Sequence, residues 1–557
     1  MTYRAPLREM QFLLDHVLDA ARVAQSPRFA DADADTTAAI LNEAAKLAEN
    51  QLEPLNRAGD IHPAKLENGV VRCSPGFPEG YQAIAEGGWI GMAASGEHGG
   101  MGMPMVLTSC VNEILASACL SLSLNPLMCQ GQIEAIEAHA SDALKDLYLP
   151  KLISGQWSGT MNLTEPQAGS DVGALSSKAI PNADGSYSIT GQKIFISWGD
   201  HDCAENIVHL VLARLPDAPG GVKGISLFIV PKFIPDAQGN PGTANAQRVV
   251  SLEHKLGLHG SPTAVMSYEG ATGWMVGAAG GGMAAMFTMM NNARLGVGIQ
   301  GLSQAELALQ KATTFAAERK QGRSPVADGS GTILDHADVR RNLMVMKTQT
   351  AAARAICLDC AISLDLARAY GDADMQARAA FLTPIAKAFG ADTGCEVASL
   401  GVQVHGGMGY IEETGAAQIY RDVRVTAIYE GTNGIQAMDL VGRKLSDGGA
   451  AAHALLAEIE VSAKNSPELQ AAHDALLGAT NWLLTAEMND RAAGAQPYLR
   501  AFALTLGGHY AVKAAAANPS RQPLTNFHLR QLMSTVPGLC AMACEGAAPL
   551  YADSLVM

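Results

Sequence analysis

Hydrophobic and polar positions repeat with two different periods along this chain. Residues 36–155 contain strong helix formers with apolar positions three and four apart, as in "TTAAILNEAAKLAENQLEPLNR", which predicts an α-helical domain. From Gln156 to about residue 275, short β-type runs such as "SYSITGQKIFIS" and "GISLFIVPKF" are separated by clusters of Pro, Gly, Asp and Asn. This second segment, 156–275, predicts a compact antiparallel barrel or sandwich.

The helical period returns after "VGAAGGGMAAM" and continues to the C-terminus. Residues 280–445 predict long helices that form a domain like a four-helix bundle. The linker-like "SDGGAAAH" then leads into a further helical tail domain, 450–557, and residues 1–35 form an N-terminal extension. The fold class is therefore a multidomain α+β protein. Strands and helices do not alternate, which disfavours a dinucleotide-binding βαβ fold.

Composition and net charge limit the classes of binding partner that the chain can have. The chain has 557 residues, 48% of them hydrophobic, and a net charge of −15, which disfavours nucleic acid or an anionic membrane as the main partner. No apolar run reaches the ~20 residues that span a bilayer, and "MTYRAPLREMQFLLDHVLDA" lacks a signal-peptide core, so we expect a cytoplasmic protein.

The ten cysteines are scattered, as expected for reduced thiols, and we predict no metal site. "CLDC" (357–360) suggests a redox pair, but its helical spacing in an Ala-rich stretch favours buried packing.

Two segments of the predicted β domain could contact a flat polar ligand. In "MNLTEPQAGSDVGALSSKA" (161–179), Thr164, Ser170 and the backbone around Gly169 could donate hydrogen bonds, although an ordinary turn explains the pattern equally well. In "GQKIFISWG" (191–199), strand alternation places Lys193, Phe195 and Ser197 on one face, where an aromatic ring beside a hydroxyl suits a heteroaromatic ligand. The alternative is a half-buried strand with Phe195 in the core.

Two cationic segments follow in the helical region. "NNARLGVGIQGL" (291–302) places Asn291 and Arg294 three positions apart near the start of a helix. "ERKQGR" (318–323) ends the next helical stretch with cations that could bind phosphates. Solvated helix ends are the ordinary explanation for both.

The segment "QVHGGMGYIEETGAAQIYRDVRVTAIYEGTNGIQ" (403–436) differs from these. Three glycines in "HGGMGY" would be costly within a helix unless the backbone bends there. Glu430 follows the apolar "VTAIY", so desolvation should raise its pKa and make the ionised carboxylate a stronger base. Gly431 removes side-chain bulk where a substrate would pass.

Six of these motifs, taken in order, resemble the acyl-CoA dehydrogenase family over residues 36–445. They are "TEPQAGSD", "GQKIFIS", "NNARLG", "ERKQGR", "QVHGGMGY" and "IYEGTNGIQ". The resemblance implies that Glu430 removes the α-proton of an acyl-CoA thioester while hydride passes from Cβ to N5 of FAD, giving a trans-2-enoyl-CoA. The site would have to exclude water and stabilise the enolate-like oxygen. In the family, the backbone N–H of the catalytic Glu and a ribityl hydroxyl of FAD stabilise that oxygen.

The resemblance also assigns binding residues. The FAD-binding set is Met161, Leu163, Thr164, Gly169, Ser170, Phe195, Ile196, Ser197, Thr432 and Asn433, with Arg319, Gln403, Gly406 and Gly407 reaching the FAD of a neighbouring subunit. The acyl-CoA set is Ser170, Asn291, Arg294 and Gly431. The chain departs from the family at Phe195, usually Trp, at Ser197, usually Thr, and at Asn291, where an acid is common. "ERKQGR" also lacks a usual aromatic residue.

Partners and substrate follow from the same resemblance. It implies a homodimer or dimer of dimers, and electron-transferring flavoprotein as acceptor. The N-terminal extension and the tail are similar to those of enzymes that oxidise 3-methylmercaptopropionyl-CoA in dimethylsulfoniopropionate degradation, and relatives in fatty acid metabolism share this layout. The substrate is thus 3-methylmercaptopropionyl-CoA or a short- or medium-chain acyl-CoA.

Three alternatives keep the same fold. An acyl-CoA oxidase would pass electrons to oxygen instead. A nitroalkane oxidase usually has Asp as its base, which Glu430 disfavours. A flavin-containing DNA-binding protein with a C-terminal helical domain is disfavoured by the acidic chain and by the few clustered cations in 450–557.

Overall fold

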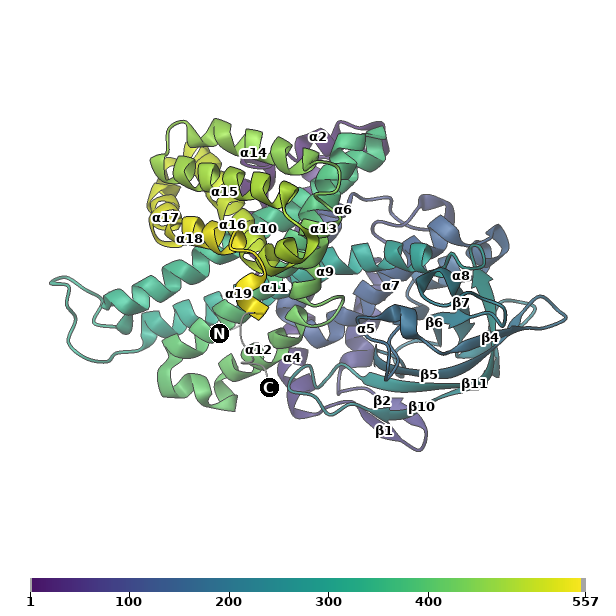
Figure 1. Cartoon of the computed structure of the whole chain (residues 1–557). Coiled ribbons are helices and arrows are strands. Elements are labelled where there is room, and N and C mark those ends of the chain that lie inside the picture. Colours follow the sequence, from purple (N-terminus) through teal and green to yellow (C-terminus); the bar gives the residue numbers. More distant parts are fainter. Residues whose placement is uncertain (1–2, 552–557) are drawn as a thin grey trace. The chain divides into compact units, whose positions relative to one another are not determined.

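The structure is a computed structural model that describes residues 3–551. Its internal contacts divide the chain into two compact units (Figure 1). We call Ala44–Met103 with Ala118–Ala293 the β-containing unit, and the remaining described residues the helical unit.

The β-containing unit combines helices with a large mixed sheet. Its helices are α4 (Glu53–Ile61), α5 (Phe77–Glu86), α7 (Leu120–His139) and α8 (Asp142–Ile153). Its strands are β1 (Lys65–Glu67), β2 (Val70–Arg72), β3 (Trp157–Asn162), β4 (Lys178–Pro181), β5 (Tyr187–Ser197), β6 (Asn206–Arg214), β7 (Ile225–Pro231), β8 (Phe233–Pro235), β9 (Pro241–Ala244), β10 (Gln247–Leu252) and β11 (Thr263–Val276). Helix α7 is apolar nearly all round and packs against β3, which explains why it is buried along most of its length.

Seven strands form the main sheet, in the order β10-β11-β5-β4-β6-β3, with β7 pairing both β11 and β6. The prediction of a purely antiparallel sheet is wrong, because β3 pairs β6 in parallel and β4 meets β6 in parallel at Lys178 and Arg214. Consecutive β-type runs with turn signals suggested hairpins, but β4 and β5 intervene between the parallel partners β3 and β6. Strands β6 and β7 are almost wholly buried, which explains their continuous apolar sequences.

A bulge interrupts the pairing of β5 with β11. The register shifts between Ala264 and Met266, opposite Ile196 and Lys193. Phe195 has a left-handed backbone with φ of 60° at this point. A bulge re-aims the side chains around it. The expectation that Lys193, Phe195 and Ser197 share one face is therefore wrong, because Lys193 is buried whereas Phe195 is 60% exposed.

Long helices dominate the helical unit. Its elements and those at its borders are α1 (Leu7–His16), α2 (Ala21–Ala24), α3 (Ala34–Leu47), α6 (Met105–Ala118), α9 (Gly282–Glu318), α10 (Ala337–Tyr370), α11 (Ala373–His405), α12 (Ala416–Val423), α13 (Asn433–Gly442), α14 (Ala450–Ala463), α15 (Pro467–Thr485), α16 (Met488–Ala517), α17 (Gln522–Phe527), α18 (Val536–Ala543) and α19 (Ala548–Tyr551). Helices α10 and α11 form a hairpin: Gly371 ends α10 with φ of 64°, and the Asp372 side chain accepts from the amides of Asp374 and Met375.

Glycines allow α9 and α11 to touch backbone to backbone. A Cβ atom on Gly298 would lie 2.5 Å from the carbonyl oxygen of Ala386, and one on Gly390 would lie 2.3 Å from that of Gly298. One turn further along, a Cβ on Gly301 would lie 2.2 Å from the carbonyl oxygen of Gly390. We call this contact the glycine seam. Larger residues would separate the two helices.

Helices of the 450–557 segment pack within the helical unit. Helix α16 contacts α10, α11, α13 and α14, and α1 contacts α16. Arg521 forms an ion pair of 2.7 Å with Glu9, and its guanidinium lies 3.6 Å from the ring centroid of Phe12. The first described residues and the last segment of the chain are thus held together.

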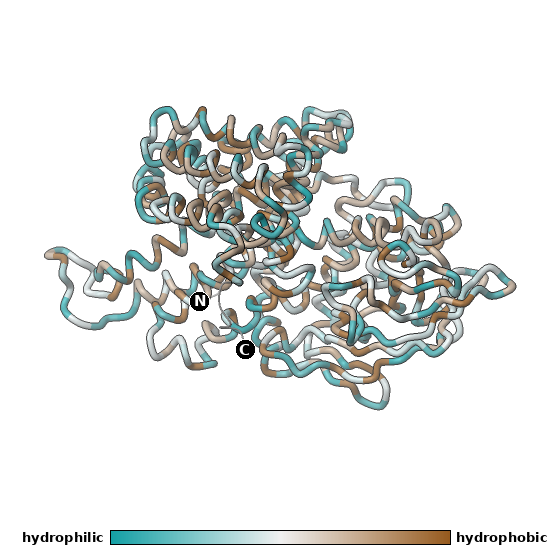
Figure 2. Tube along the Cα trace, viewed as in Figure 1, coloured by the Kyte–Doolittle hydropathy of each residue, from teal (hydrophilic) through white to brown (hydrophobic). Residues whose placement is uncertain are grey.

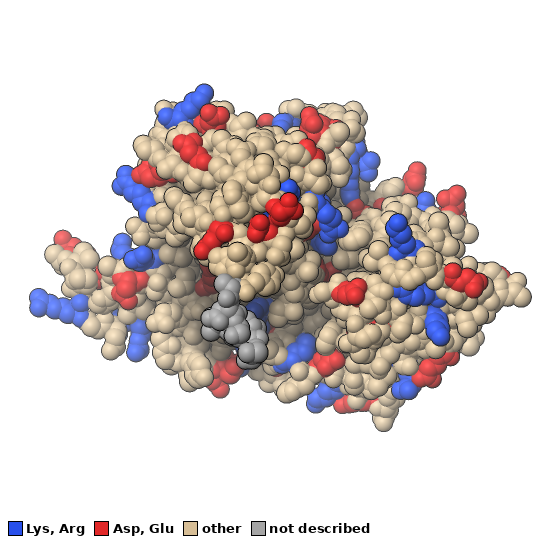
Figure 3. Space-filling view, in the orientation of Figure 1, with Lys and Arg blue, Asp and Glu red and all other residues tan. Residues whose placement is uncertain are grey.

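The preference for packing over redox chemistry at "CLDC" is confirmed. The side chains of Cys357 and Cys360 are fully buried on α10, and their thiols face backbone carbonyls of α11. Along the chain as a whole, hydrophobic and hydrophilic residues are interspersed (Figure 2). Within the described residues, no helix has the length and apolarity needed to cross a membrane. On the face in Figure 3, basic and acidic side chains are interspersed.

Candidate active site

Glu430 lies in a short turn between the helical segment Arg424–Ala427 and α13. Its backbone is left-handed, with φ of 56°, which is uncommon for a residue with a side chain and is typical of functional sites. The side chain is half-buried, and its Oε2 atom is buried without a hydrogen-bond partner among the described residues. An unpartnered carboxylate oxygen is costly to bury and therefore needs an explanation, such as a ligand or a catalytic role.

Burial raises the pKa of Glu430 to about 7, and the positive charges of Arg294 and Lys387 oppose this rise. Arg294 on α9 is itself buried, and desolvation lowers its pKa while Asp439 and Glu430 raise it. The expectation that Glu430 has a raised pKa is thus confirmed. A carboxyl with a pKa near 7 is matched to proton abstraction at neutral pH.

A buried polar network supports this turn from α11. The Lys387 ammonium is fully buried and donates to Asn433 Oδ1 at 2.9 Å. Asn433 in turn donates through Nδ2 to Asp392 Oδ1 at 2.6 Å and to the carbonyl of Ala388. Burial lowers the pKa of Lys387 to about 8, and Glu430 and Asp392 oppose this. The network ties the start of α13 to α11 and places a cation near the carboxylate.

The turn itself is clamped by its own residues. Thr432 caps α13, because its hydroxyl accepts from the amide of Ile435 at 3.2 Å. Gln436 donates through Nε2 to the carbonyls of Glu430 and Gly431, each at 3.3 Å. Gly431 has φ of 84°, and a Cβ there would lie 2.8 Å from Gln436 Nε2. Gly431 therefore has a local structural reason beside the one expected from substrate access.

In the β-containing unit, a buried ion pair organises the loop after β3. Glu165 accepts from Lys193 at 2.9 Å and from the amides and hydroxyls of Ser176 and Ser177. Burial opposes its ionisation, but Lys193 and these hydrogen bonds lower its pKa to about 2. The amide of Ile194 also donates to the carbonyl of Thr164 at 2.9 Å, so this loop is tied to β5 at two points.

The candidate flavin residues of this unit differ in exposure. Met161, Leu163, Thr164 and Ser197 are half-buried, and Gly169 and Ser170 are exposed. Phe195 presents its ring to solvent, so the alternative that it belongs to the core is wrong. Ile196 is the exception: its side chain is 2% exposed and belongs to the sheet core, which leaves only its backbone for a ligand.

The remaining candidates are distributed over both units. Asn291 is exposed and belongs to the β-containing unit, whereas Arg294 belongs to the helical unit. Neither lies near the start of its helix, because α9 begins at Gly282. Arg319 is exposed directly after α9, and Gln403, Gly406 and Gly407 are exposed at the end of α11, with open space beside both glycines.

Sequence reasoning missed Lys387, Asp392, Gln436 and the Glu165–Lys193 pair. A signal existed for Lys387, which is the one cation in "FLTPIAKAFGA", an otherwise apolar helical run that must be buried. Glu165 is part of the "TEPQAGSD" motif, but nothing in a loop sequence shows which strand residue will neutralise a carboxylate.

Three family models match the chain: the acyl-CoA dehydrogenase N-terminal domain over residues 34–156, the middle domain over 160–271 and the C-terminal domain over 280–445. The chain therefore belongs to the acyl-CoA dehydrogenase family of oxidoreductases, with N-terminal helical, middle β and C-terminal helical domains. This family is a family of flavoproteins that bind FAD. The family resemblance expected from the motifs is confirmed.

Among its relatives is the 3-methylmercaptopropionyl-CoA dehydrogenase of Ruegeria pomeroyi, 48% identical over 460 residues, which cover 81% of this chain and 78% of that protein. A butyryl-CoA dehydrogenase of Syntrophomonas wolfei is 35% identical over 79% of this chain and 75% of its own length. The solved structure of Caenorhabditis elegans ACDH-11 in complex with C11-CoA superposes with a TM-score of 0.81 at 20% identity, covering 100% of this chain and 96% of that one. This last likeness supports the fold.

Proposed function

We propose that this chain catalyses α,β-dehydrogenation of an acyl-CoA thioester with Glu430 as the base that removes the α-proton. The observation that carries the proposal is the buried, unpartnered Oε2 of Glu430 on a strained turn. Among the carboxylates of the helical unit, Glu430 combines this free oxygen with a pKa raised to about 7. General bases need a pKa near the working pH and a lone pair aimed into a site rather than at a partner.

The residues around Glu430 prepare the proton transfer. Arg294 and Lys387 hold its pKa below the value that burial alone would give, so a useful fraction is ionised at neutral pH. Gln436 and Thr432 restrain the turn, which limits the loss of orientation when substrate binds.

The exposed surface of the β-containing unit fits a flavin. Phe195 offers an aromatic ring held outward by a bulge, and the adjacent loop carries the small exposed residues Gly169 and Ser170. The Glu165–Lys193 pair keeps both elements rigid. When bound, FAD accepts the hydride that leaves Cβ of the acyl group.

We assign the binding residues as follows. FAD would be held by Met161, Leu163, Thr164, Gly169, Ser170, Phe195, the Ile196 backbone, Ser197, Thr432 and Asn433, and in a second subunit by Arg319, Gln403, Gly406 and Gly407. Acyl-CoA would contact Ser170, Asn291, Arg294 and Gly431. Asn433 would act through its network as well, because its side chain is already engaged by Lys387 and Asp392.

A homodimer or dimer of dimers is part of the proposal. It is supported by exposed apolar side chains around Gly406–Tyr410, where Met408 is 47% and Tyr410 is 86% exposed. Several further assignments remain proposals: the division of the chain at 36–155, 156–275 and 280–445, a barrel-like closure of the sheet, and an additional helical domain at 450–557. Electron-transferring flavoprotein as the acceptor and a cytoplasmic location are proposals as well.

For the acyl group we propose 3-methylmercaptopropionyl-CoA, because the relative named for that activity is 48% identical over most of both chains. A short-chain acyl-CoA such as butyryl-CoA is the second candidate, because relatives named for it are 33–35% identical.

Anaerobic titration of the purified protein with both acyl-CoAs and with longer chains tests the proposal. We expect the flavin absorbance to bleach most completely with 3-methylmercaptopropionyl-CoA. A protein without flavin that cannot be reconstituted with FAD would contradict the proposal. Peroxide formed in air at a rate equal to turnover would indicate the oxidase instead.

A further inference from the structure

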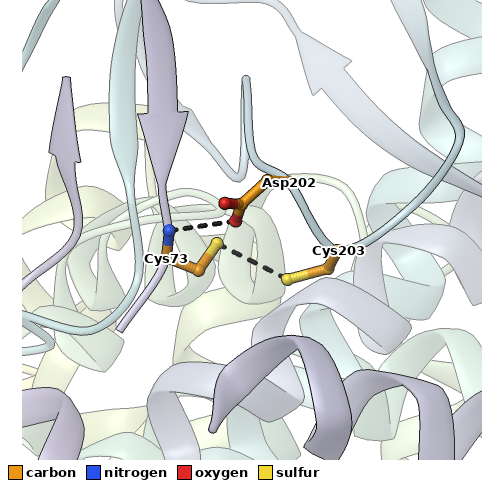
Figure 4. A group of neighbouring side chains, drawn as sticks. All are labelled: Cys73, Asp202 and Cys203. Atoms are coloured by element: carbon orange, nitrogen blue, oxygen red, sulfur yellow. Dashed lines mark hydrogen bonds between the residues drawn. The ribbon is translucent and has the colours of Figure 1, made fainter. Parts of the chain in front are cut away.

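Two cysteines that are not among the residues assigned above face each other in the β-containing unit. Cys73 follows directly after β2, and Cys203 lies in the loop between β5 and β6. Their sulfur atoms are 3.5 Å apart although the residues are 130 positions apart in the chain (Figure 4). Both residues are partly exposed.

Asp202 fixes the two segments against each other. Its Oδ1 accepts from the backbone amide of Cys73 at 3.0 Å (Figure 4). Its Oδ2 pairs with Arg72 at 3.2 Å. On the other side, the amide of Cys203 donates to Nδ1 of the buried His201. These contacts hold both cysteine backbones in place without involving either thiol.

We propose that Cys73 and Cys203 form a reversible disulfide, which makes this pair a thiol modification site for a low-molecular-weight disulfide such as oxidised glutathione. The arrangement favours a disulfide over a metal ion. A closed zinc site takes four ligands, whereas here both oxygens of Asp202 are engaged and both ring nitrogens of His201 are engaged by Ser158 and Cys203. The described residues bring three candidate ligands together here, Cys73, Asp202 and Cys203, which is one fewer than a closed zinc site takes.

The reaction proceeds by two exchanges. One cysteine thiolate attacks a sulfur of the oxidised glutathione, forms a mixed disulfide and displaces one glutathione thiolate. The facing cysteine then loses its proton and attacks the protein-bound sulfur, which closes the Cys73–Cys203 bond and releases the second glutathione. Two electrons pass from the protein sulfurs to glutathione. A hydrogen bond to Cys73 and burial raise the pKa of the Cys203 thiol, which disfavours Cys203 as the attacking thiolate.

The bond would restrain the end of β5. The loop that carries Cys203 begins right after Ser197, and Trp198 in it has φ of 55° and donates to the carbonyl of Ser121. A covalent link from this loop to β2 therefore limits the motion of the strand end that carries Phe195. The inference does not depend on the proposed function, because it concerns bond formation alone.

The test equilibrates the FAD-loaded full-length protein in glutathione buffers of increasing oxidation, blocks free thiols with iodoacetamide and maps the peptides by mass spectrometry. We expect a cross-linked peptide containing Cys73 and Cys203 that disappears on reduction with dithiothreitol. The oxidised protein should also melt about 3 to 6 °C above the reduced protein, because the bond closes a long loop of the unfolded chain.

Cys73→Ser and Cys203→Ser should each abolish the cross-link and the difference in melting temperature. Cys544→Ser, which removes a half-buried thiol of the helical unit, is the matched control and should change neither. Two alkylated thiols under the most oxidising buffer would overturn the proposal, as would separate glutathione adducts on the two cysteines. Stoichiometric zinc that is retained by the wild type and lost in Cys73→Ser would overturn it in favour of a metal site.

Discussion

Glu430 and Glu165 are carboxylates removed from water in the two units of the molecule, and their surroundings differ in nearly every respect. Glu165 accepts hydrogen bonds at both oxygens and pairs with Lys193, and its pKa falls to about 2. Glu430 keeps one oxygen without a partner, and its pKa rises to about 7. Burial is common to both, so the number of partners decides whether a carboxylate becomes a structural anion or a base.

The comparison also shows where each charge is neutralised. Lys193 contacts Glu165 directly, whereas Lys387 near Glu430 donates instead to Asn433. A cation in direct contact would lower the pKa of Glu430 and occupy the oxygen that has to meet the proton. Because the Lys387 ammonium donates to Asn433 and not to Glu430, its charge adjusts the pKa of Glu430 and leaves the carboxylate oxygen available.

The largest effect is expected from Glu430→Gln. We expect the variant to fold and bind acyl-CoA yet to lose activity by about 10⁴-fold, because an amide cannot accept the α-proton. Stopped-flow bleaching of the flavin measures this. Normal bleaching in the variant would remove Glu430 from its role.

Glu165→Ala tests the opposite carboxylate. It leaves Lys193 buried without a counter-ion, which should lower the free energy of unfolding by about 3 to 5 kcal/mol in urea at pH 7. The wild-type contribution is present above the unfolded pKa of 4.5 and is lost as pH falls toward 2. The control is Glu269→Ala, which breaks an exposed pair with Arg248 and should cost less than about 1 kcal/mol. Equal losses in both variants would contradict the structural role of Glu165.

Stability should change in the opposite sense at Glu430. Its folded pKa of about 7 lies above the unfolded 4.5, so the folded state binds the extra proton and loses stability as pH rises from 4.5 to 7. At pH 8, Glu430→Gln should therefore be more stable than the wild type by about 2 to 3 kcal/mol. The difference should vanish below pH 4.5. Urea unfolding at both pH values measures it, and a less stable variant at pH 8 would show that Glu430 is not desolvated.

Lys387→Met sharpens the comparison at the cation. Removing this charge should raise the pKa of Glu430 further, so the pH of half-maximal kcat/KM should move upward from about 7 by about one unit. Activity at pH 6 then falls more than activity at pH 9. Lys387→Arg should retain the wild-type profile more closely. A uniform loss of activity at all pH values would indicate packing damage alone.

The smallest effect is expected from Thr432→Ala, which removes the cap of α13. We expect a loss of about 1 kcal/mol in the free energy of unfolding, because the amide of Ile435 loses its acceptor. Thr432→Ser keeps the hydroxyl and should unfold like the wild type. If both variants lose the same stability, the methyl group rather than the cap is responsible.

The sequence was sufficient for the order of helical and β segments and for Glu430, because both depend on local patterns. Apolar residues before an acid and glycine after it are readable without a fold. Phe195 shows the limit of prediction from local patterns. Strand alternation predicts that its side chain lies on the same face as that of Lys193, but a bulge in the pairing of β5 turns the Phe195 side chain outward. Bulges depend on the partner strand, which the local sequence does not specify.

Hydrogen-bond networks between distant segments could not be predicted from the sequence for the same reason. Lys387, Asp392 and Asn433 come together because α11 and α13 pack, and Glu165 meets Lys193 across 28 positions. The parallel pairing of β3 with β6 is a further case, since hydrophobic runs do not indicate strand direction.

The glycine seam between α9 and α11 has a consequence for how this enzyme can be altered. Arg294 and Lys387 lie on these two helices close to Gly298 and Gly390, where even one added methyl group would push the backbones apart. The spacing of the two cations is therefore not adjustable by small substitutions there. Changes that adapt the catalyst to longer or bulkier acyl groups have to be sought on other surfaces, with this pair of helices kept as a constant frame.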